Sequence, residues 1–507
     1  MAGIETWFPG GTSLTASDYV VLCAELSVLF LIGYWVGRGR KTTSDFFLAR
    51  RSIPWWAACL SFVATEISAM TIIGVPATTF RENWQYAQFF IGSAGARLVI
   101  AFLFIPAFYQ HNCTTIYEFL RFRFGNQTQY TSTVFFFVTR LLASGVRLMA
   151  ACVAVSVLLG WHLIPVIGLF TMVSIVYIGF GGIRSVVWTN VFQAVSFIAA
   201  GLATLFFAVW SVDGGIPAIW ATAEAAGRLD LWNWGPPLGE PGWLVKFLSD
   251  PNVIWIAVLN GFFGSMAAFG TDHELMQRLL TVETRRESQM SMVYTIAASF
   301  GALMLFMAVG TSLYSYYALH PGLAQPQALD KIYPHFTVQV MPAVLRGMVL
   351  SAIIMASIDS PLASLSASFV TDIYKPLIRH DADEGHYLAV SRLSVVVFGA
   401  LLGVIAYVFS FYDKMLWLAF KIGGVTFGSL LGVFLLGLMT QRKANRANTV
   451  AMVGMALINL TLLILSEKKI LPLGWSWLVI LGTLGTFGLG WVLGPVLDKD
   501  LPEPPRA

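Results

Sequence analysis

Residues 61–77 read SFVATEISAMTIIGVPA, an apolar run that is interrupted near its middle by Thr65, Glu66, Ser68 and Thr71. An ionised side chain at the centre of a bilayer costs at least about 3 kcal/mol, so its presence needs a structural or functional reason. Polar groups are tolerated at membrane depth where a helix unwinds beside a cavity. The stretch therefore predicts a transmembrane helix that is broken at a binding cavity.

The composition of the chain indicates a multi-pass membrane protein. Of its 507 residues, 57% are hydrophobic and 11% are charged, whereas about 25% are charged in a typical soluble domain. Apolar runs of roughly 20 residues, the length that crosses a hydrocarbon core, follow one another along the sequence. We expect an all-α protein of the cell membrane, embedded in the lipid bilayer, with about thirteen spans: 18–37, 54–79, 84–108, 130–160, 161–181, 185–211, 252–271, 289–317, 344–370, 390–411, 414–439, 448–467 and 473–496.

Basic residues cluster in alternate loops, and such loops face the cytoplasm. With an odd number of spans, this pattern places the N-terminus outside and the C-terminus inside the cell. The basic residues that carry the assignment are Arg38, Arg40, Lys41, Arg50, Arg51, Arg121, Arg123, Arg278, Arg285, Arg286, Lys375, Arg379, Arg442, Lys443 and Arg446.

A second span has a similar interruption. It covers 252–271 and contains LNGFFGS at 259–265. Interrupted spans at matching places in two halves are typical of transporters built from inverted repeats. The offset of five spans predicts repeats at 54–211 and 252–439. The remaining parts would be an extra N-terminal helix with a basic loop (1–53), an outer loop (212–251), and C-terminal helices with a tail (440–507).

Several other functions are disfavoured by the sequence. The net charge of +4 comes without a basic face that would indicate a nucleic-acid partner, and the four cysteines lack metal-ligand spacing. Neither HExxH nor GxSxG occurs, so we predict no catalytic residues and no enzyme activity.

Charged residues in mid-span have two interpretations. Glu66, Arg147, Asp359 and Lys421 either form a functional site or pair with one another to hold the fold. Arg97 lies nearer a helix end, where we expect snorkelling or local pairing.

A serine-rich segment offers oxygen ligands. Ser357, Ser360 and Ser364 share one helical face, and Pro361 distorts the turn and frees the Ser357 carbonyl. Sodium is a hard cation that favours such oxygens. Close packing of small residues is an equally good explanation.

The chain resembles the sodium/solute symporter family, whose members have an inverted five-helix repeat core like that of the amino-acid transporter LeuT. The resemblance covers nearly the whole chain. It implies sodium-driven import of a small polar solute, no organic cofactor, and function as a monomer. The segments that carry it are SFVATEISAMTIIGVPA (61–77), GGIRSVVWTNVFQ (181–193), DHELMQRLL (272–280) and SIDSPLASLSASFVTDIY (357–374).

The resemblance also implies an ion site. Its main sodium ligands are backbone carbonyls of two helices and one serine hydroxyl. The matching positions are Ala64, Ile67, Ile353, Ala356 and Ser357.

At a second cation site, found in some family members, this chain departs from the family pattern. Family members that have one carry an aspartate where this chain has Asn190, and a serine where it has Asp359. We interpret this as a carboxylate that has moved to the facing helix, with Ser360 and Glu66 as further candidates. The alternative is that Asp359 or Glu66 carries a proton.

The substrate residues follow from the same resemblance. Arg147 matches the arginine that binds the substrate carboxylate in sialic-acid transporters, and its planar fork suits that group. An organic acid is therefore the expected solute, with a neutral sugar or proton coupling as alternatives. The other predicted lining residues are Ser68, Thr71, Tyr86, Gln88, Phe90, Asn260 and Phe263.

Overall fold

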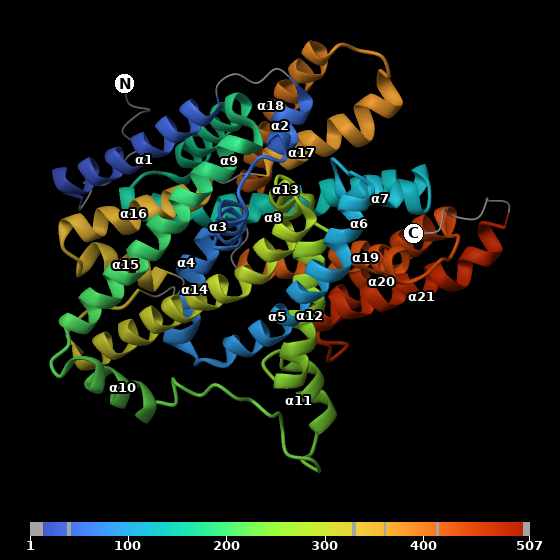
Figure 1. Cartoon of the computed structure of the whole chain (residues 1–507). Helices are drawn as coiled ribbons and strands as arrows, with labels where there is room; N and C mark the ends of the chain where they lie inside the picture. Colours follow the sequence, from blue (N-terminus) through green and yellow to red (C-terminus); the bar gives the residue numbers. More distant parts are fainter. Residues whose placement is uncertain (1–13, 38–41, 327–330, 359–360, 412–414, 500–507) are drawn as a thin grey trace.

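The computed structural model describes residues 14–37, 42–326, 331–358, 361–411 and 415–499, and in these ranges the protein is helical without β-strands. Figure 1 shows long helices that run roughly side by side, with short helices at both ends of the bundle. The helices of the first part are α1 (Ala16–Gly37), α2 (Thr43–Leu48), η1 (Ala49–Arg51), α3 (Trp55–Glu66), α4 (Ala69–Arg81), η2 (Gln85–Ala87), α5 (Gln88–Val99), η3 (Ile100–Phe104), α6 (Ile105–Gln110), α7 (Ile116–Arg123), α8 (Asn126–Leu159) and α9 (Leu163–Trp210).

The second part continues the bundle. Its helices are α10 (Gly215–Ala225), α11 (Trp243–Ser249), α12 (Ile254–Gly270), α13 (His273–Leu280), α14 (Arg285–Leu319), α15 (Ile332–Gln339), α16 (Ala343–Ile358), α17 (Leu362–Ser368), η5 (Phe369–Ile378), α18 (Glu384–Phe409), α19 (Met415–Met439), α20 (Asn445–Glu467) and α21 (Ser476–Leu497).

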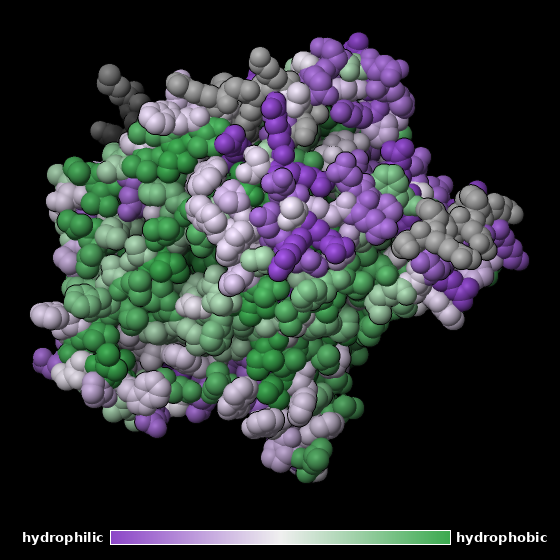
Figure 2. Space-filling view, viewed as in Figure 1, coloured by the Kyte–Doolittle hydropathy of each residue, from purple (hydrophilic) through white to green (hydrophobic). Residues whose placement is uncertain are grey.

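Many of these helices are suited to a bilayer. Among the described residues, nine helices are long and apolar enough to cross a membrane, and the bent pair α3–α4 makes a tenth candidate. Three shorter apolar helices, 163–176, 343–356 and 423–439, lie where further spans were expected. Figure 2 shows an apolar band on the visible face and a polar cap over the end that carries α2, α13 and α18. The protein is thus a multi-pass membrane protein, while the count of thirteen and the orientation of the termini stay predictions.

The predicted break in the first helix is confirmed. α3 ends at Glu66, α4 begins at Ala69, and the two helices meet at an angle of 56°. Ile67 (φ −73°, ψ 88°) and Ser68 (φ −92°, ψ 173°) have non-helical backbones.

The turn at the paired glycines is also a real change of direction. Gly182 has φ 55° and ψ −169° inside α9. Because L-residues with a side chain rarely adopt this backbone, a glycine is required there. The kink separates the helix into the two spans expected on either side of it.

The predicted interruption of the second span is wrong. α12 is helical from Ile254 to Gly270 without a break. A Cβ atom at Gly261 would lie 2.9 Å from the carbonyl carbon of Phe89 in α5, and one at Gly92 would lie 2.9 Å from that of Val258 in α12. These glycines therefore allow two intact helices to cross closely, a second common use of glycine in membrane helices.

Candidate functional site

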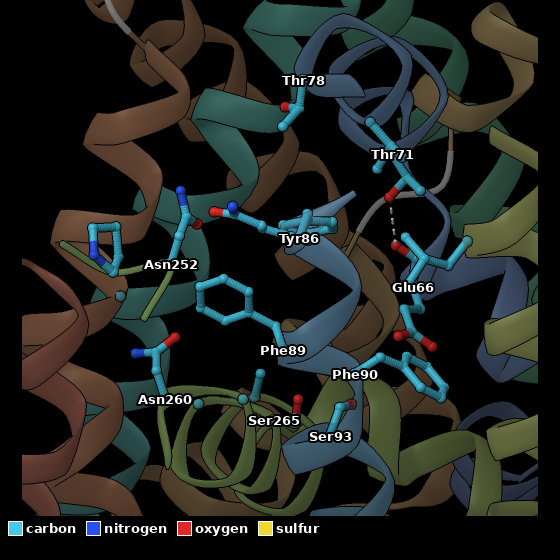
Figure 3. Close-up of a pocket in the computed structure, with 18 of the residues that line it drawn as sticks. Glu66, Thr71, Thr78, Tyr86, Phe89, Phe90, Ser93, Asn252, Asn260 and Ser265 are labelled. Atoms are coloured by element: carbon cyan, nitrogen blue, oxygen red, sulfur yellow. Dashed lines mark hydrogen bonds between the residues drawn. The ribbon is translucent and has the colours of Figure 1, made fainter. Parts of the chain in front are cut away.

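A cavity of about 1090 Å³ lies between α4, α5, α12, α14 and α19. It extends to Arg81, Glu82 and Asn252, at the end of the bundle that carries α10 and α11. Figure 3 shows Glu66 and Thr71 at one wall and Asn252 and Asn260 at the opposite one. Its polar lining deep in the protein consists of Glu66, Thr71, Ser93, Asn260, Ser265 and Ser299.

Glu66 stands at the break and lines this cavity. It is the last residue of α3, and its side chain keeps 24% of its surface exposed. Its Oε1 accepts a hydrogen bond from Arg97 Nη2 at 2.5 Å, and its Oε2 accepts one from Ser299 Oγ at 2.6 Å. The carboxylate is therefore anchored by two donors, and the partly exposed side chain forms part of the cavity wall.

Arg97 is fully buried behind Glu66, which the sequence did not predict. Its Nη1 donates to Thr295 Oγ1 at 2.8 Å and to Ser299 Oγ at 3.3 Å. Three aromatic rings surround the guanidinium, with centroids 4.7–5.9 Å from Cζ: those of Phe62, Phe90 and Phe269. Of the two expectations for Arg97, snorkelling is wrong, because this part of α5 faces the bundle interior, whereas the arginine does form an ion pair, with Glu66 of α3.

Arg147 approaches the same break from α8. Its Nη2 donates to the carbonyl of Thr65 at 2.9 Å. It is not among the residues that line the cavity. The suggested pairing of Arg147 with Glu66 is replaced by the Arg97–Glu66 ion pair.

Two of the predicted sodium ligands have the required chemistry. Among the described residues, no hydrogen-bond donor reaches the carbonyl of Ala64 or of Ile67. The neighbouring carbonyls differ: Val63 accepts from Ile67 N at 2.8 Å, and Glu66 accepts from Ser68 N at 3.0 Å. Buried carbonyls without a donor fit a cation that takes oxygen ligands.

The other predicted ligands lie in α16. Ile353 and Ala356 are buried there, and α16 packs against α4 and α9. Ser357 falls in the last turn of this helix, and its hydroxyl is outside what the structure describes. The complete ligand set therefore stays a prediction.

The region of the predicted second site is partly visible. Asn190 is buried, and its Nδ2 donates to Thr65 Oγ1 at 3.0 Å, which ties α9 to α3. One turn along, Gln193 Nε2 donates to the Met355 carbonyl at 3.2 Å. Asp359 and Ser360 lie outside the described residues, so the exchange of a carboxylate between helices stays a prediction.

The predicted substrate residues divide into two groups. Thr71, Tyr86, Phe90 and Asn260 line the cavity. Ser68, Gln88, Arg147 and Phe263 do not.

Two residues of these groups have clear structural roles. Gln88 holds the loops together, since its Nε2 donates to the carbonyls of Gln85 (3.1 Å) and Asn252 (3.0 Å), and its Oε1 accepts from Asn233 N (3.1 Å). Asn260 lines the cavity but also donates to the Ser476 carbonyl at 2.7 Å, which links α12 to α21.

Comparison with known proteins agrees with this architecture. The profile of the Sodium:solute symporter family matches residues 46–457. The chain belongs to the sodium:solute symporter family. It is thus a sodium-coupled solute transporter of the membrane, as the sequence predicted.

Individual relatives of this symporter are distant. The Sodium/sialic acid symporter NanT of Aliivibrio fischeri is 28% identical over 500 residues, covering 96% of this chain and 94% of the relative. The human Sodium-coupled monocarboxylate transporter 1 is 27% identical over 434 residues, covering 83% of this chain and 69% of the relative.

The fold is shared with solved transporters. The substrate-bound, outward-open structure of a Na⁺-coupled sialic acid symporter matches with a TM-score of 0.83 at 23% identity, covering 95% of this chain and 98% of that one. The closed, bromovinylhydantoin-bound structure of Mhp1, a nucleobase-cation-symport-1 family transporter, matches with a TM-score of 0.53 at 15% identity, covering 91% and 97%. These likenesses establish the fold of the symporter.

Buried ion pairs join two elements of the symporter at the end opposite α10 and α11. Arg140 of α8 contacts Asp272 and, at 2.7 Å, Glu274 Oε2 of the following α13. All three side chains are at most 5% exposed, and every residue of α13 is buried. The cavity is thus open toward α10 and α11, while charged contacts hold α13 tightly at the other end.

A further carboxylate is buried near α7, in η5 after the predicted span 344–370. Asp372 accepts from Thr115 Oγ1 (2.7 Å), Gln129 Nε2 (2.9 Å) and Thr133 Oγ1 (3.4 Å). All three donors are neutral. Burial, followed by the nearby charge of Glu118, raises the pKa of Asp372 to about 8.

Proposed function

We propose that this symporter uses the sodium gradient to import a small carboxylate-bearing solute through the cavity beside Glu66. The observation that carries the proposal is the break between α3 and α4. The carbonyls of Ala64 and Ile67, which no donor within the described ranges reaches, lie there, and so do the contacts of Arg147 and Glu66. An ion site and a solute site that share one irregular segment are expected to influence each other.

The shared segment explains how the sodium gradient could drive solute uptake. Each sodium ion that enters gains about 2.3 kcal/mol per 100 mV of membrane potential, in addition to its concentration gradient. This energy drives solute uptake only if filling both sites shifts the balance between conformations. A sodium ion at Ala64 and Ile67 would fix the geometry of the break, and with it the position of Glu66 and of the Thr65 carbonyl.

Two observations support a carboxylate group on the transported solute: the position of Arg147 and the names of the relatives. Their names specify sialic acid and monocarboxylates. Arg147 donates to the Thr65 carbonyl at the break, and a guanidinium binds a carboxylate more strongly than a neutral carbonyl. We therefore propose Arg147 as the group that a solute carboxylate would contact. As the family resemblance implies, we propose that the monomer is the functional unit.

A neutral, hydroxylated solute is the second candidate. Arg147 does not line the cavity, whereas Ser93, Asn260, Ser265 and Ser299 do. Proton coupling through Glu66 is less well supported, because its carboxylate is already paired with a fully buried arginine.

The proposal is tested by uptake into proteoliposomes. Labelled N-acetylneuraminate, lactate and glucose are supplied with an inward sodium or potassium gradient at two external pH values. We expect uptake of at least one acid to require sodium, and Ser357→Ala to lower the apparent sodium affinity about tenfold or more. Ser364→Ala is the matched control, since that buried hydroxyl donates to the Pro361 carbonyl of its own helix at 2.8 Å.

Each alternative has its own signature. Sodium-driven uptake of glucose alone would support the neutral-solute candidate. Uptake that ignores sodium and follows a proton gradient would refute sodium coupling.

A further inference from the structure

We propose that Glu66, positioned by Arg97, is the group that selects solutes with a hydroxyl or ammonium donor next to their carboxylate. This rests on the proposed transport of a carboxylate and specifies which carboxylates are accepted.

The Glu66 carboxylate has unused capacity to accept hydrogen bonds. An ionised carboxylate offers about four acceptor sites. Two are occupied, one by Arg97 Nη2 and one by Ser299 Oγ. The side chain keeps 24% of its surface exposed and lines the cavity (Figure 3), so we infer that the remaining acceptor capacity is available to a solute there.

The net charge of the Arg97–Glu66 pair limits which solute groups can bind to Glu66. Arg97 is completely buried and pairs with Glu66, so the pair as a whole is neutral. A neutral hydroxyl, or the ammonium of a zwitterion whose carboxylate compensates it, adds no net charge.

The Glu66 carboxylate is held in a fixed position by Arg97. Arg97 itself is fixed by Thr295, by Ser299 and by three surrounding aromatic rings. The carboxylate therefore does not reorganise when a solute arrives, and a solute without a donor would leave it desolvated and unsatisfied. Sites built to bind a donor reject analogues that lack it far more strongly than they reject a change of size.

The experiment compares three acids of equal carbon number: propionate, which has no donor beside the carboxylate, L-lactate, which has a hydroxyl, and L-alanine, which has an ammonium group. Binding to the purified full-length symporter is measured by thermal shift in sodium and in potassium. A hydrogen bond to a charged group corresponds to roughly tenfold to hundredfold in affinity. We expect lactate, alanine or both to bind at least about tenfold more tightly than propionate.

The variant Glu66→Met/Arg97→Met removes the acceptor and its counter-charge together, so no unpaired charge is left in the protein. We expect the ratio of lactate or alanine affinity to propionate affinity to fall to about threefold or less, whatever the absolute affinities of the variant are. Glu82→Gln is the matched control, because Glu82 also lines the cavity but lies at its exposed mouth beside Arg81. It should retain the full preference.

The outcomes separate the two proposals. If propionate binds in sodium as tightly as the donor-bearing acids, or if the double variant keeps the preference, Glu66 does not select the donor. If lactate alone shows the gain, the donor is a hydroxyl, and if alanine alone shows it, an ammonium group. If none of the acids shows sodium-dependent binding, the proposed carboxylate transport is wrong, and the selection inferred from it falls as well.

Discussion

Replacing Gly261 by alanine probes the close crossing of α5 and α12. The new Cβ would lie 2.9 Å from the carbonyl carbon and 3.2 Å from the Cα of Phe89, and nearer still to the carbonyl oxygen. These are backbone atoms of a packed helix, so no side-chain rotation relieves the overlap. In an unconstrained helix the same change would gain about 1 kcal/mol from helix propensity. Overpacking typically costs about 1–3 kcal/mol, and a backbone overlap lies at or above the upper end. We therefore expect a net destabilisation of about 2 kcal/mol or more.

The control for Gly261 lies one turn further along the same helix. A Cβ at Gly264 would meet only Asn260 Oδ1, at 3.9 Å. Gly264→Ala should therefore keep the stability of the wild type or raise it slightly. Both variants are compared by thermal unfolding in one detergent. Equal melting temperatures for Gly261→Ala and Gly264→Ala would refute the close-crossing explanation and would revive the unwound helix that the sequence suggested.

Three further perturbations test other parts of the structure. Arg97→Met should cost about 3 kcal/mol or more because it strands the Glu66 carboxylate, whereas Arg97→Met/Glu66→Met should recover most of the loss, as a double-mutant cycle in thermal unfolding would show. Asp372→Asn tests the raised pKa of about 8. The stability that the protonated carboxyl contributes is present at low pH and is lost as the pH rises toward 8. The wild type should therefore lose stability relative to the variant between about pH 5 and pH 8 in thermal unfolding, and the difference should then level off. Arg140→Gln should lower the melting temperature strongly, because buried Asp272 loses the arginine it contacts and Glu274 is left with the more distant Arg278, at 3.8 Å. An unchanged melting temperature would contradict the buried contacts with α13.

The break in the first helix was predictable from the sequence because a glutamate in an apolar run has few physical explanations. Glycine is less informative. The glycines of 259–265 were interpreted as a sign of unwinding, but Gly261 allows the close contact with Phe89. Helix unwinding and close helix crossing both favour glycine, so the sequence alone does not distinguish them. Only the position of the neighbouring helix distinguishes them.

Arg97 shows a second limit of the sequence. It lies within the apolar stretch QFFIGSAGARLVIAFLF at 88–104, and that position should have raised the same question as Glu66. Which face of a helix points inward depends on all its neighbours, so the three aromatic rings around the guanidinium could not be inferred from local spacing. Arg147, by contrast, was recognised as important, and the structure places it at the Thr65 carbonyl rather than in the cavity wall.

The break between α3 and α4 brings these features together. Thr65, Glu66 and Ile67 are consecutive, yet their polar groups point to different partners: the Thr65 carbonyl to Arg147, the Glu66 carboxylate to Arg97, and the Ile67 carbonyl to no donor among the described residues. A regular helix would direct all three carbonyls along its axis to residues of its own next turn. Because the helix ends here, an ion, a solute and a buried arginine can each contact the same three residues. We expect a change at one of these contacts to affect the backbone that presents the other two, and such a link is the physical condition for coupling the ion to the solute.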